Sequence, residues 1–111
     1  MIIIREPTNS EKIREMAEPF FGLRIKLAVD VAKEILAGGG ELHFDCEQLL
    51  LDDGSKQENI WGADWYPITK EVGFESIINI RPRQQNVTME VRDLQLKSRI
   101  EKIVRYLLEV V

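Results

Sequence analysis

The chain has 111 residues, of which 44% are hydrophobic and 31% are charged. This length and composition are typical of one globular domain with a single core, and they argue against two domains and against disorder across the chain. The 15 basic and 19 acidic residues give a formal net charge of -4, which disfavours broad binding to nucleic acid or another polyanion.

The cysteine content and the N-terminal residues indicate the compartment. The single cysteine, Cys46, cannot form an internal disulfide. Charge appears at the fifth residue, and no apolar run approaches the roughly 20 residues that a membrane helix needs. We therefore expect a cytoplasmic protein that has no signal peptide and does not bind a membrane.

A short strand and a helix are predicted near the N-terminus. The β-branched run from Ile2 to Ile4 favours a buried strand, which Pro7 ends. Residues 8–11 have the spacing of a capping box, in which the first hydroxyl accepts the third backbone N–H and the last carboxylate reaches back. Apolar residues follow at helical spacing, and Pro19 is expected to end or kink this helix near Glu18.

Residues 24–31 alternate apolar with polar or small side chains, which predicts a strand of period two. We favour a hairpin that turns near residues 32–34, with a returning strand from Ile35 to about His43. The three glycines at 38–40 would then mark a bulge or a close backbone approach, since glycine is weak in a regular strand. The alternative for residues 32–37 is a short helix that ends at a glycine cap.

The middle of the chain is predicted to hold one short helix and two strands. Asp45 can cap a helix over residues 46–52, and the alternative is a strand over residues 48–51. Residues 60–66 and 72–81 have strand patterns and are expected to pair antiparallel. A loop is expected to follow them.

The clearest predicted element is an amphipathic helix of about four turns that begins after Asp93. Its apolar stripe consists of Leu96, Ile100, Ile103, Val104, Leu107, Leu108 and Val111. Hairpin-connected strands with helices at both ends predict one α+β domain over residues 1–111. In this fold a largely antiparallel sheet is covered on one face by an N-terminal and a C-terminal amphipathic helix.

The polar residues after the three glycines are the first candidates for a site. If residues 41–47 are extended, one strand face carries three carboxylates and an imidazole, which could hold a divalent cation or pair a general base with an acid. This row consists of Glu41, His43, Asp45 and Glu47, and the polar turn after it adds Ser55 and Gln57. The alternative is a solvated edge with a structural His43, and a helix that starts at Asp45 would break the row.

Other motifs of the same region are incomplete. No segment completes a calcium loop or a phosphate loop, so we assign no cofactor and no metal. Cys46 and His43 could form a reactive thiolate and imidazole pair only if one helix ran through both. The apolar neighbours Phe44 and Leu49 favour a buried, unreactive thiol instead.

Two further groups of residues are candidates for a ligand or an interface. Trp61 and Trp65 share one face of a predicted strand, where they could line a ligand groove or a subunit interface, or belong to the core. Arg81 and Arg83 flank a rigid proline in the loop of residues 81–86, next to amide side chains. Guanidinium groups suit phosphate, carboxylate or RNA, although exposed arginines are usually just solvated.

Several short runs resemble a family of small bacterial proteins described as a domain of unknown function. They are Gly39 to His43 with Asp45, Leu51 to Gln57, Trp61-Gly62 and Ile78 to Pro82. The similarity extends over most of the chain. The resemblance implies a single-domain, intracellular protein, and because the family has no assigned activity it implies no catalytic residue.

We therefore expect a small binding module, with self-association as a homodimer through the tryptophan strand or the C-terminal helix as one mode. An alternative from a different class is a metal-assisted hydrolase that uses His43, Asp45 and Glu41 or Glu47, with Arg81 as an anion clamp. A second alternative is contact with RNA or another anion through residues 81–86, although the net charge makes a nucleic acid the less favoured partner.

Overall fold

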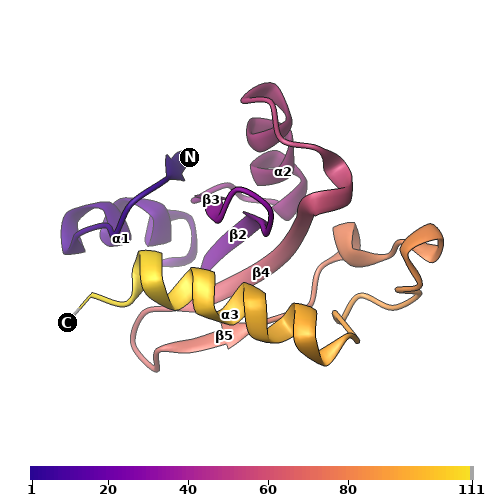
Figure 1. Cartoon of the computed structure of the whole chain (residues 1–111). Coiled ribbons are helices and arrows are strands. Elements are labelled where there is room, and N and C mark those ends of the chain that lie inside the picture. The colour runs from indigo at the N-terminus through magenta and orange to yellow at the C-terminus, as the bar shows by residue number, and fades with distance from the viewer. Residues whose placement is uncertain (111) are drawn as a thin grey trace.

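Five short strands form one antiparallel sheet, and three α-helices cover it (Figure 1). The computed structural model describes residues 1–110. In chain order the elements are β1 (Ile2–Ile4), α1 (Ser10–Ala17), η1 (Glu18–Phe20), β2 (Ile25–Asp30), β3 (Ile35–Gly38), α2 (His43–Asp52), η2 (Gln57–Asn59), β4 (Ile60–Tyr66), β5 (Glu71–Gly73), η3 (Ile77–Asn79), η4 (Pro82–Gln84) and α3 (Leu94–Leu108). The strand order is β1-β3-β2-β4-β5, and each neighbouring pair is antiparallel. The predicted α+β fold class is confirmed.

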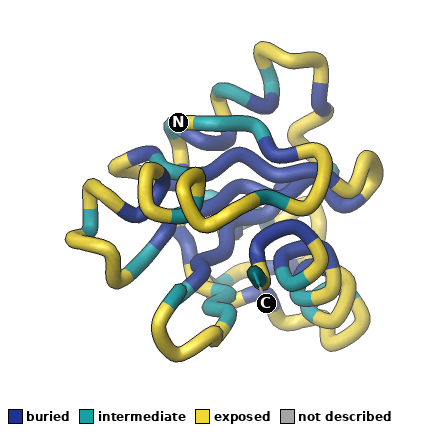
Figure 2. The backbone as a smooth tube through the Cα atoms, turned by 90° about the vertical axis from the view of Figure 1, so that its left-hand side faces the viewer, coloured by how far each residue is buried: buried dark blue, intermediate teal, exposed yellow. Residues whose placement is uncertain are grey.

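Helices cover both faces of the sheet. Leu27 and Val29 of β2 belong to the main core cluster, which also contains residues of α1 and α3. Ala28 between them packs with Cys46 and Leu50 of α2 in a second cluster on the other face. Figure 2 shows the strands in dark blue through the middle of the molecule, with exposed turns around them. The expectation that helices cover only one face of the sheet was wrong. Small residues such as Ala28 occur on buried and on exposed faces alike, so the sequence pattern alone does not distinguish the two.

The first helix is capped one residue later than predicted. The side chain of Asn9 accepts the backbone N–H of Lys12 at 2.9 Å. The Thr8 hydroxyl does not cap the helix, and the Thr8 N–H instead donates to the carbonyl of Leu107 at the end of α3, at 2.9 Å. α1 ends at Ala17 and continues as the short helix η1, so the predicted break near Pro19 is confirmed.

The hairpin between β2 and β3 is confirmed, but its second strand is shorter than predicted. β3 ends at Gly38, where an added Cβ would lie 2.9 Å from side-chain atoms of Leu27 and Met16. The predicted close approach at the glycines is therefore present. Gly39 has a φ of +96°, a conformation that glycine adopts readily, and the chain leaves the sheet there.

α2 begins earlier than the predicted helix over residues 46–52. Its first residue is His43, and the carboxylate of Asp45 accepts the backbone N–H of Leu42 at 3.3 Å. Asp45 thus caps the helix from inside its first turn rather than from the position before it. The segment is therefore not extended past His43.

The predicted strand over residues 72–81 was wrong beyond Gly73, where β5 ends. Residues 76–89, here called the arm, fold back on themselves. Backbone bridges between Glu75 and Glu90 and between Arg81 and Asn86 close this segment. The arm is the orange part of Figure 1, and it projects from the body of the molecule.

Asn79 attaches the arm to β4 by taking the place of a neighbouring strand. Its Oδ1 accepts the N–H of Gly62 at 2.7 Å, and its Nδ2 donates to the Gly62 carbonyl at 3.0 Å. The same Nδ2 lies 3.2 Å from the carbonyls of Phe74 and Met89, on the two sides of the arm. Ser76 packs directly on Gly62, where an added Cβ would lie 2.5 Å from the Ser76 Cβ. The chain therefore crosses over β4 instead of pairing beside it.

The C-terminal helix is confirmed as α3. The carboxylate of Asp93 caps it by accepting the N–H groups of Gln95 and Leu96 at 2.8 and 3.1 Å. Its apolar stripe is buried at Ile100, Ile103, Val104, Leu107 and Leu108. Val111, the last predicted member of the stripe, lies outside the described residues. No helix within residues 1–110 has both the length and the apolar character that crossing a bilayer requires.

Candidate functional site

Arg81 lies at the centre of a polar cluster between α2 and the arm. Its Nε donates to the carbonyl of Ile78 at 3.0 Å, and its Nη1 donates to the carbonyl of Gln57 at 2.5 Å. Its Nη2 donates to Glu47 Oε2 at 3.1 Å. The guanidinium also lies over the ring of Trp61, 4.8 Å from the centroid. One arginine thus joins α2, η2, β4 and the arm.

Glu47 is a buried carboxylate with only 4% of its surface exposed. Burial raises the pKa of Glu47, and the nearby charge of Arg81 and a hydrogen bond from Gln57 oppose this rise without cancelling it. Buried titratable groups with a shifted pKa are concentrated at functional sites, although structural ion pairs also produce them. Glu47 is therefore the titratable group of this cluster with the strongest indication of a functional role.

A groove of about 510 Å³ opens beside the pair of Glu47 and Arg81. Polar and apolar side chains both line it: Glu47, Gln57, Arg81, Arg83 and Gln84, with Ile77, Ile78, Ile80 and Pro82. Ile77 and Ile80 remain 71% and 44% exposed. Four of the predicted site residues, which come from three separate segments of the sequence, therefore line one groove.

A second polar cluster joins His43 to Asp64. The Nε2 of His43 lies 2.9 Å from Asp64 Oδ1 and 3.1 Å from the Ala63 carbonyl. Both partners are acceptors, so Nε2 carries the hydrogen. Arg24 binds the same carboxylate with Nε and Nη2, each at 3.1 Å. This cluster ties the first turn of α2 to Asp64 of β4 and to Arg24, the residue before β2.

The ionisation of Asp64 is favoured by its partners. Burial opposes the charged form, but the hydrogen bonds and charges of His43 and Arg24 outweigh it and lower the pKa of Asp64. The carboxylate is only 3% exposed. Asp64 is therefore a buried, charged anchor that is fully provided with donors, and we assign His43 a structural role here.

The predicted row of polar residues does not form, because α2 begins at His43. Glu41 is exposed before the helix, and Asp45 caps the helix. His43 and Glu47 lie one helical turn apart but bind different partners, Asp64 and Arg81. The Ser55 hydroxyl is buried and has no hydrogen-bond partner among the described residues.

No metal centre is visible in the described part of the chain. Within residues 1–110, no group of three or more His, Cys, Asp or Glu side chains is placed to hold a metal ion. The Cys46 thiol is buried and donates to the carbonyl of Lys26 at 3.4 Å, and burial raises the pKa of this thiol. Cys46 is therefore not engaged with His43, although one helix contains both.

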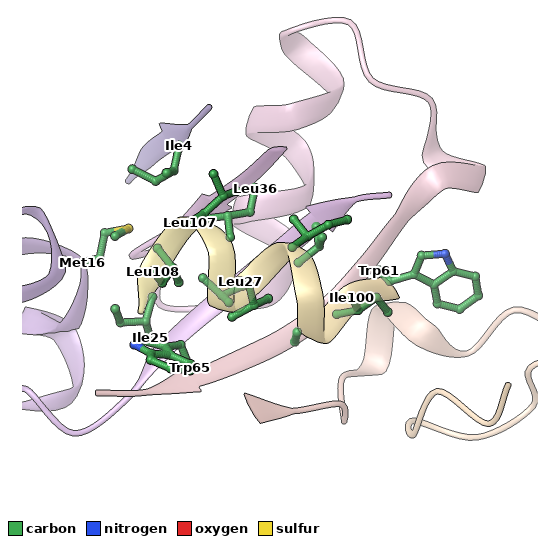
Figure 3. Close-up of a cluster of buried hydrophobic side chains, with 14 of the residues drawn as sticks. Ile4, Met16, Ile25, Leu27, Leu36, Trp61, Trp65, Ile100, Leu107 and Leu108 are labelled. Carbon is green, nitrogen blue, oxygen red and sulfur yellow. The ribbon is translucent and has the colours of Figure 1, made fainter. Parts of the chain in front are cut away.

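Both tryptophans belong to the main core (Figure 3). Trp65 packs below one end of α3, and Arg105 of that helix lies over its ring. Trp61 lies at the other end of the cluster, where Arg81 of the arm covers it. The strand face that could have lined a ligand groove or an interface is thus covered by the protein's own elements.

Three residues of these clusters were not recognised in the sequence. Asp64 and Arg24 form the buried charged anchor, and Asn79 attaches the arm. A signal for Asp64 existed, because the strand alternation places it on the face opposite Trp61 and Trp65. A carboxylate on that face indicates a buried polar site only if another element covers the face. α2 was not predicted to cover it.

The fold and the cluster around Arg81 define a class of small α+β domain, in which an antiparallel sheet lies between helices and a folded arm forms one wall of a groove. The family model described as "Protein of unknown function (DUF5674)" matches residues 2–107, so the chain belongs to this family. The resemblance found in the sequence to a family of unknown function is confirmed. No curated protein and no solved structure matches the chain significantly.

Proposed function

We propose that this chain is a small binding module whose binding site is the groove between α2, η2 and the arm. The observation that carries the proposal is the convergence of Glu47, Gln57, Arg81 and Arg83 with two exposed isoleucines on one groove. Its volume of about 510 Å³ is in the range of ligand sites in proteins, about 300–1,000 Å³. Ligand sites combine apolar lining with polar groups that fix the orientation of the ligand, and this groove offers both kinds of side chain.

The unequal state of the two arginines indicates the chemistry of the ligand. Arg81 is engaged by Glu47, by two carbonyls and by the ring below it, so it holds the groove together. Arg83 is exposed and has no acidic partner among residues 1–110. The arm contains no acidic residue at all. We therefore expect a ligand that presents an apolar group beside a carboxylate, sulfonate or phosphate.

An apolar anionic dye tests this site. We expect 1-anilinonaphthalene-8-sulfonate to bind the folded protein at low micromolar protein concentration, with a dissociation constant that rises about tenfold in Arg83→Glu, since a charged contact is lost and reversed. Ile77→Ser should weaken binding as well. Ile68→Ser is the matched control, because Ile68 is 73% exposed but lies in the turn between β4 and β5.

The dye experiment can contradict the proposal directly. Circular dichroism of each variant shows whether the fold is retained, so that dye binding to an unfolded state is recognised. Equal dye affinity in wild type, Arg83→Glu and Ile77→Ser would place the dye elsewhere and remove the support for this groove as the binding site.

Two other functions raised by the sequence have their own tests. A metal-assisted hydrolase that uses His43 predicts a thermal shift with Mn, Zn, Mg or Ni that is lost in His43→Ala, since a bound metal stabilises the folded state. RNA contact through residues 81–86 predicts affinity that falls steeply with salt. Of the two arginines there, only Arg83 has no acidic partner among the described residues. One such arginine provides little positive charge for an RNA backbone, so we rank RNA below an apolar anion.

The same proposal includes the cytoplasm as its compartment. It is supported by the free thiol of Cys46, which is fully buried and needs no oxidising environment. Self-association through the tryptophan strand or the α3 stripe has less support, since both surfaces are buried within one copy.

A further inference from the structure

Phe21 is the most exposed large hydrophobic residue in the described part of the chain, with 92% of its surface accessible. Its backbone has a φ of 58° and a ψ of 32°, which is the left-handed region that favours glycine. Residues with a Cβ are rare in this region, and such outliers persist where the surrounding structure imposes them. Glu34, Lys70 and Gln85 also have a positive φ, so it is the exposure of its ring that distinguishes Phe21.

Backbone hydrogen bonds fix the turn that carries Phe21. The N–H of Phe21 donates to the Glu18 carbonyl at 3.1 Å, and the N–H of Gly22 donates to the Ala17 carbonyl at 2.9 Å. The N–H of Leu23, which is also exposed, donates to the Phe20 carbonyl at 3.0 Å. Residues 19–23, here called the knob, therefore present Phe21 outward from a hydrogen-bonded turn.

We propose that the knob of one copy binds the groove of a second copy, with the Phe21 ring against Ile77 and Ile80. This inference rests on the proposed function, because it names a natural occupant of that groove. The groove is large enough for an aromatic ring and is lined by two isoleucines that are exposed in a single copy. Both surfaces lose apolar area to water when they meet.

One charge pair is available between the two surfaces. The knob itself contains no charged residue. Glu18 precedes it, and Arg24 and Lys26 follow it and lie over the Phe20 ring. The arm contains two arginines and no acidic residue, and Arg83 is the one without an acidic partner among residues 1–110. Glu18 is exposed beside the knob, so it can pair with Arg83 of the second copy when Phe21 occupies the groove. A charge pair of this kind favours a fixed orientation of the two copies.

The knob and the groove lie at opposite ends of the sheet. The knob leads directly into β2, whose first residue Ile25 pairs with Trp65. The groove is built around Arg81, which covers Trp61 at the other end of β4. In Figure 1 the end of α1 that leads to the knob and the orange arm are on opposite sides of the molecule. Each copy thus offers both surfaces, and the contact is head-to-tail rather than between two identical patches.

A mixing experiment with full-length variants tests the contact. Phe21→Ser removes the knob, and Ile77→Ser combined with Arg83→Glu removes the groove. Sedimentation velocity from low micromolar to submillimolar concentration should show wild type growing in size with concentration, whereas each variant alone stays monomeric. A mixture of the two variants should form a one-to-one complex, because one supplies the intact knob and the other the intact groove. Ile68→Ser should sediment as wild type does.

Several outcomes would overturn the inference. A wild type that stays monomeric at all concentrations, a Phe21→Ser variant that associates as wild type does, or a mixture without a complex would each exclude the contact. If dye binding in Phe21→Ser still depends on Arg83 while the mixture stays monomeric, the groove is a binding site and only its occupant was assigned wrongly. If dye binding is also insensitive to Arg83→Glu, the proposed function fails as well.

Discussion

Phe21 combines an exposed ring with a left-handed backbone conformation. The left-handed conformation costs a residue with a Cβ about 1 kcal/mol. The ring is almost fully exposed, so burial within the same copy does not offset this cost. The backbone of Phe21 is therefore better suited to asparagine or glycine than to the residue that is present.

This argument predicts that Phe21→Asn stabilises the monomer, by about 0.5–1 kcal/mol, because asparagine tolerates the left-handed region. Urea unfolding at low protein concentration measures the change. Leu23→Asn is the control in the same turn, since Leu23 is exposed but does not have a positive φ, and it should leave the stability nearly unchanged. A loss of stability in Phe21→Asn would show that the ring contributes to the fold of one copy.

The buried ion pairs of Asp64 lead us to expect a loss of folding stability in acid. Its pKa is lowered in the folded state, so its charged form contributes stability that is fully present above the unfolded pKa of about 3.9 and is lost as pH falls through the folded value. Asp64→Asn should lower the stability by about 3 kcal/mol at neutral pH, because Arg24 and His43 lose a buried partner. It should also flatten the decline below about pH 4.

Urea unfolding of wild type and Asp64→Asn from acid to neutral pH separates the two effects. Asp52→Asn is the matched control, because Asp52 is exposed at the end of α2 and is not paired with a cation among the residues described. Parallel pH profiles for wild type and Asp64→Asn would mean that another carboxylate dominates the acid sensitivity.

At the scale of elements, the arm contains only the two short helices η3 and η4, and side-chain amides attach it to the sheet. Asn79 supplies both a donor and an acceptor to Gly62, and Asn86 donates to the carbonyls of Asn79, Thr88 and Glu90. Buried amides of this kind leave several backbone groups without a partner when they are removed. The arm is therefore held by two side chains more than by an apolar core of its own.

Asn79→Ala is expected to lower the free energy of unfolding by about 3 kcal/mol, since several buried groups lose their partner together. Hydrogen exchange should show lost protection at the backbone N–H of Gly62 and of arm residues such as Ser76, while the amides of β2 and β3 change less. Asn59→Ala is the control, because its side chain makes no hydrogen bond within residues 1–110. Unchanged protection of the arm would mean that Asn79 is not its main attachment.

The elements differ in how far the sequence predicted them. α3 was predicted closely because a long stripe and an Asp93 cap act together within one segment. The prediction of a strand over residues 72–81 was wrong because the alternating pattern is a local property of the sequence. The observed conformation depends on the contact of Asn79 with Gly62, 17 residues away. The site shows the same limit. Arg81, Glu47 and Gln57 were individually recognisable as polar candidates, but only the folded arm brings them together.

At the scale of the whole molecule, the Cα radius of gyration is 12.6 Å, close to the value of about 13 Å expected for a compact domain of this length. The molecule is longer in one direction than in the others, with extents of 38, 28 and 22 Å. The radius of gyration of a single copy is therefore a reference value, and association of copies would raise the measured value above it.

Small-angle X-ray scattering should therefore distinguish a single copy from an assembly. Phe21→Ser is expected to keep a radius of gyration of about 13 Å at every concentration, since it lacks the knob. Wild type should start near the same value and rise as the concentration increases, because a head-to-tail contact leaves a free knob and a free groove on every assembly that does not close. Identical curves for both proteins at high concentration would contradict this expectation.

The attachment of Asn79 to Gly62 also bears on aggregation. β5 pairs only with Asp64–Tyr66, so the edge of β4 over its first four residues has no neighbouring strand. An open edge of this kind is a template for strand addition by another chain, and proteins commonly cover it. Here a single amide occupies the donor and the acceptor that an incoming strand would need at Gly62. We propose that copies of this protein associate through side chains, so they meet repeatedly. Because Asn79 covers Gly62, these contacts expose no unpaired backbone there from which an irreversible fibre could grow.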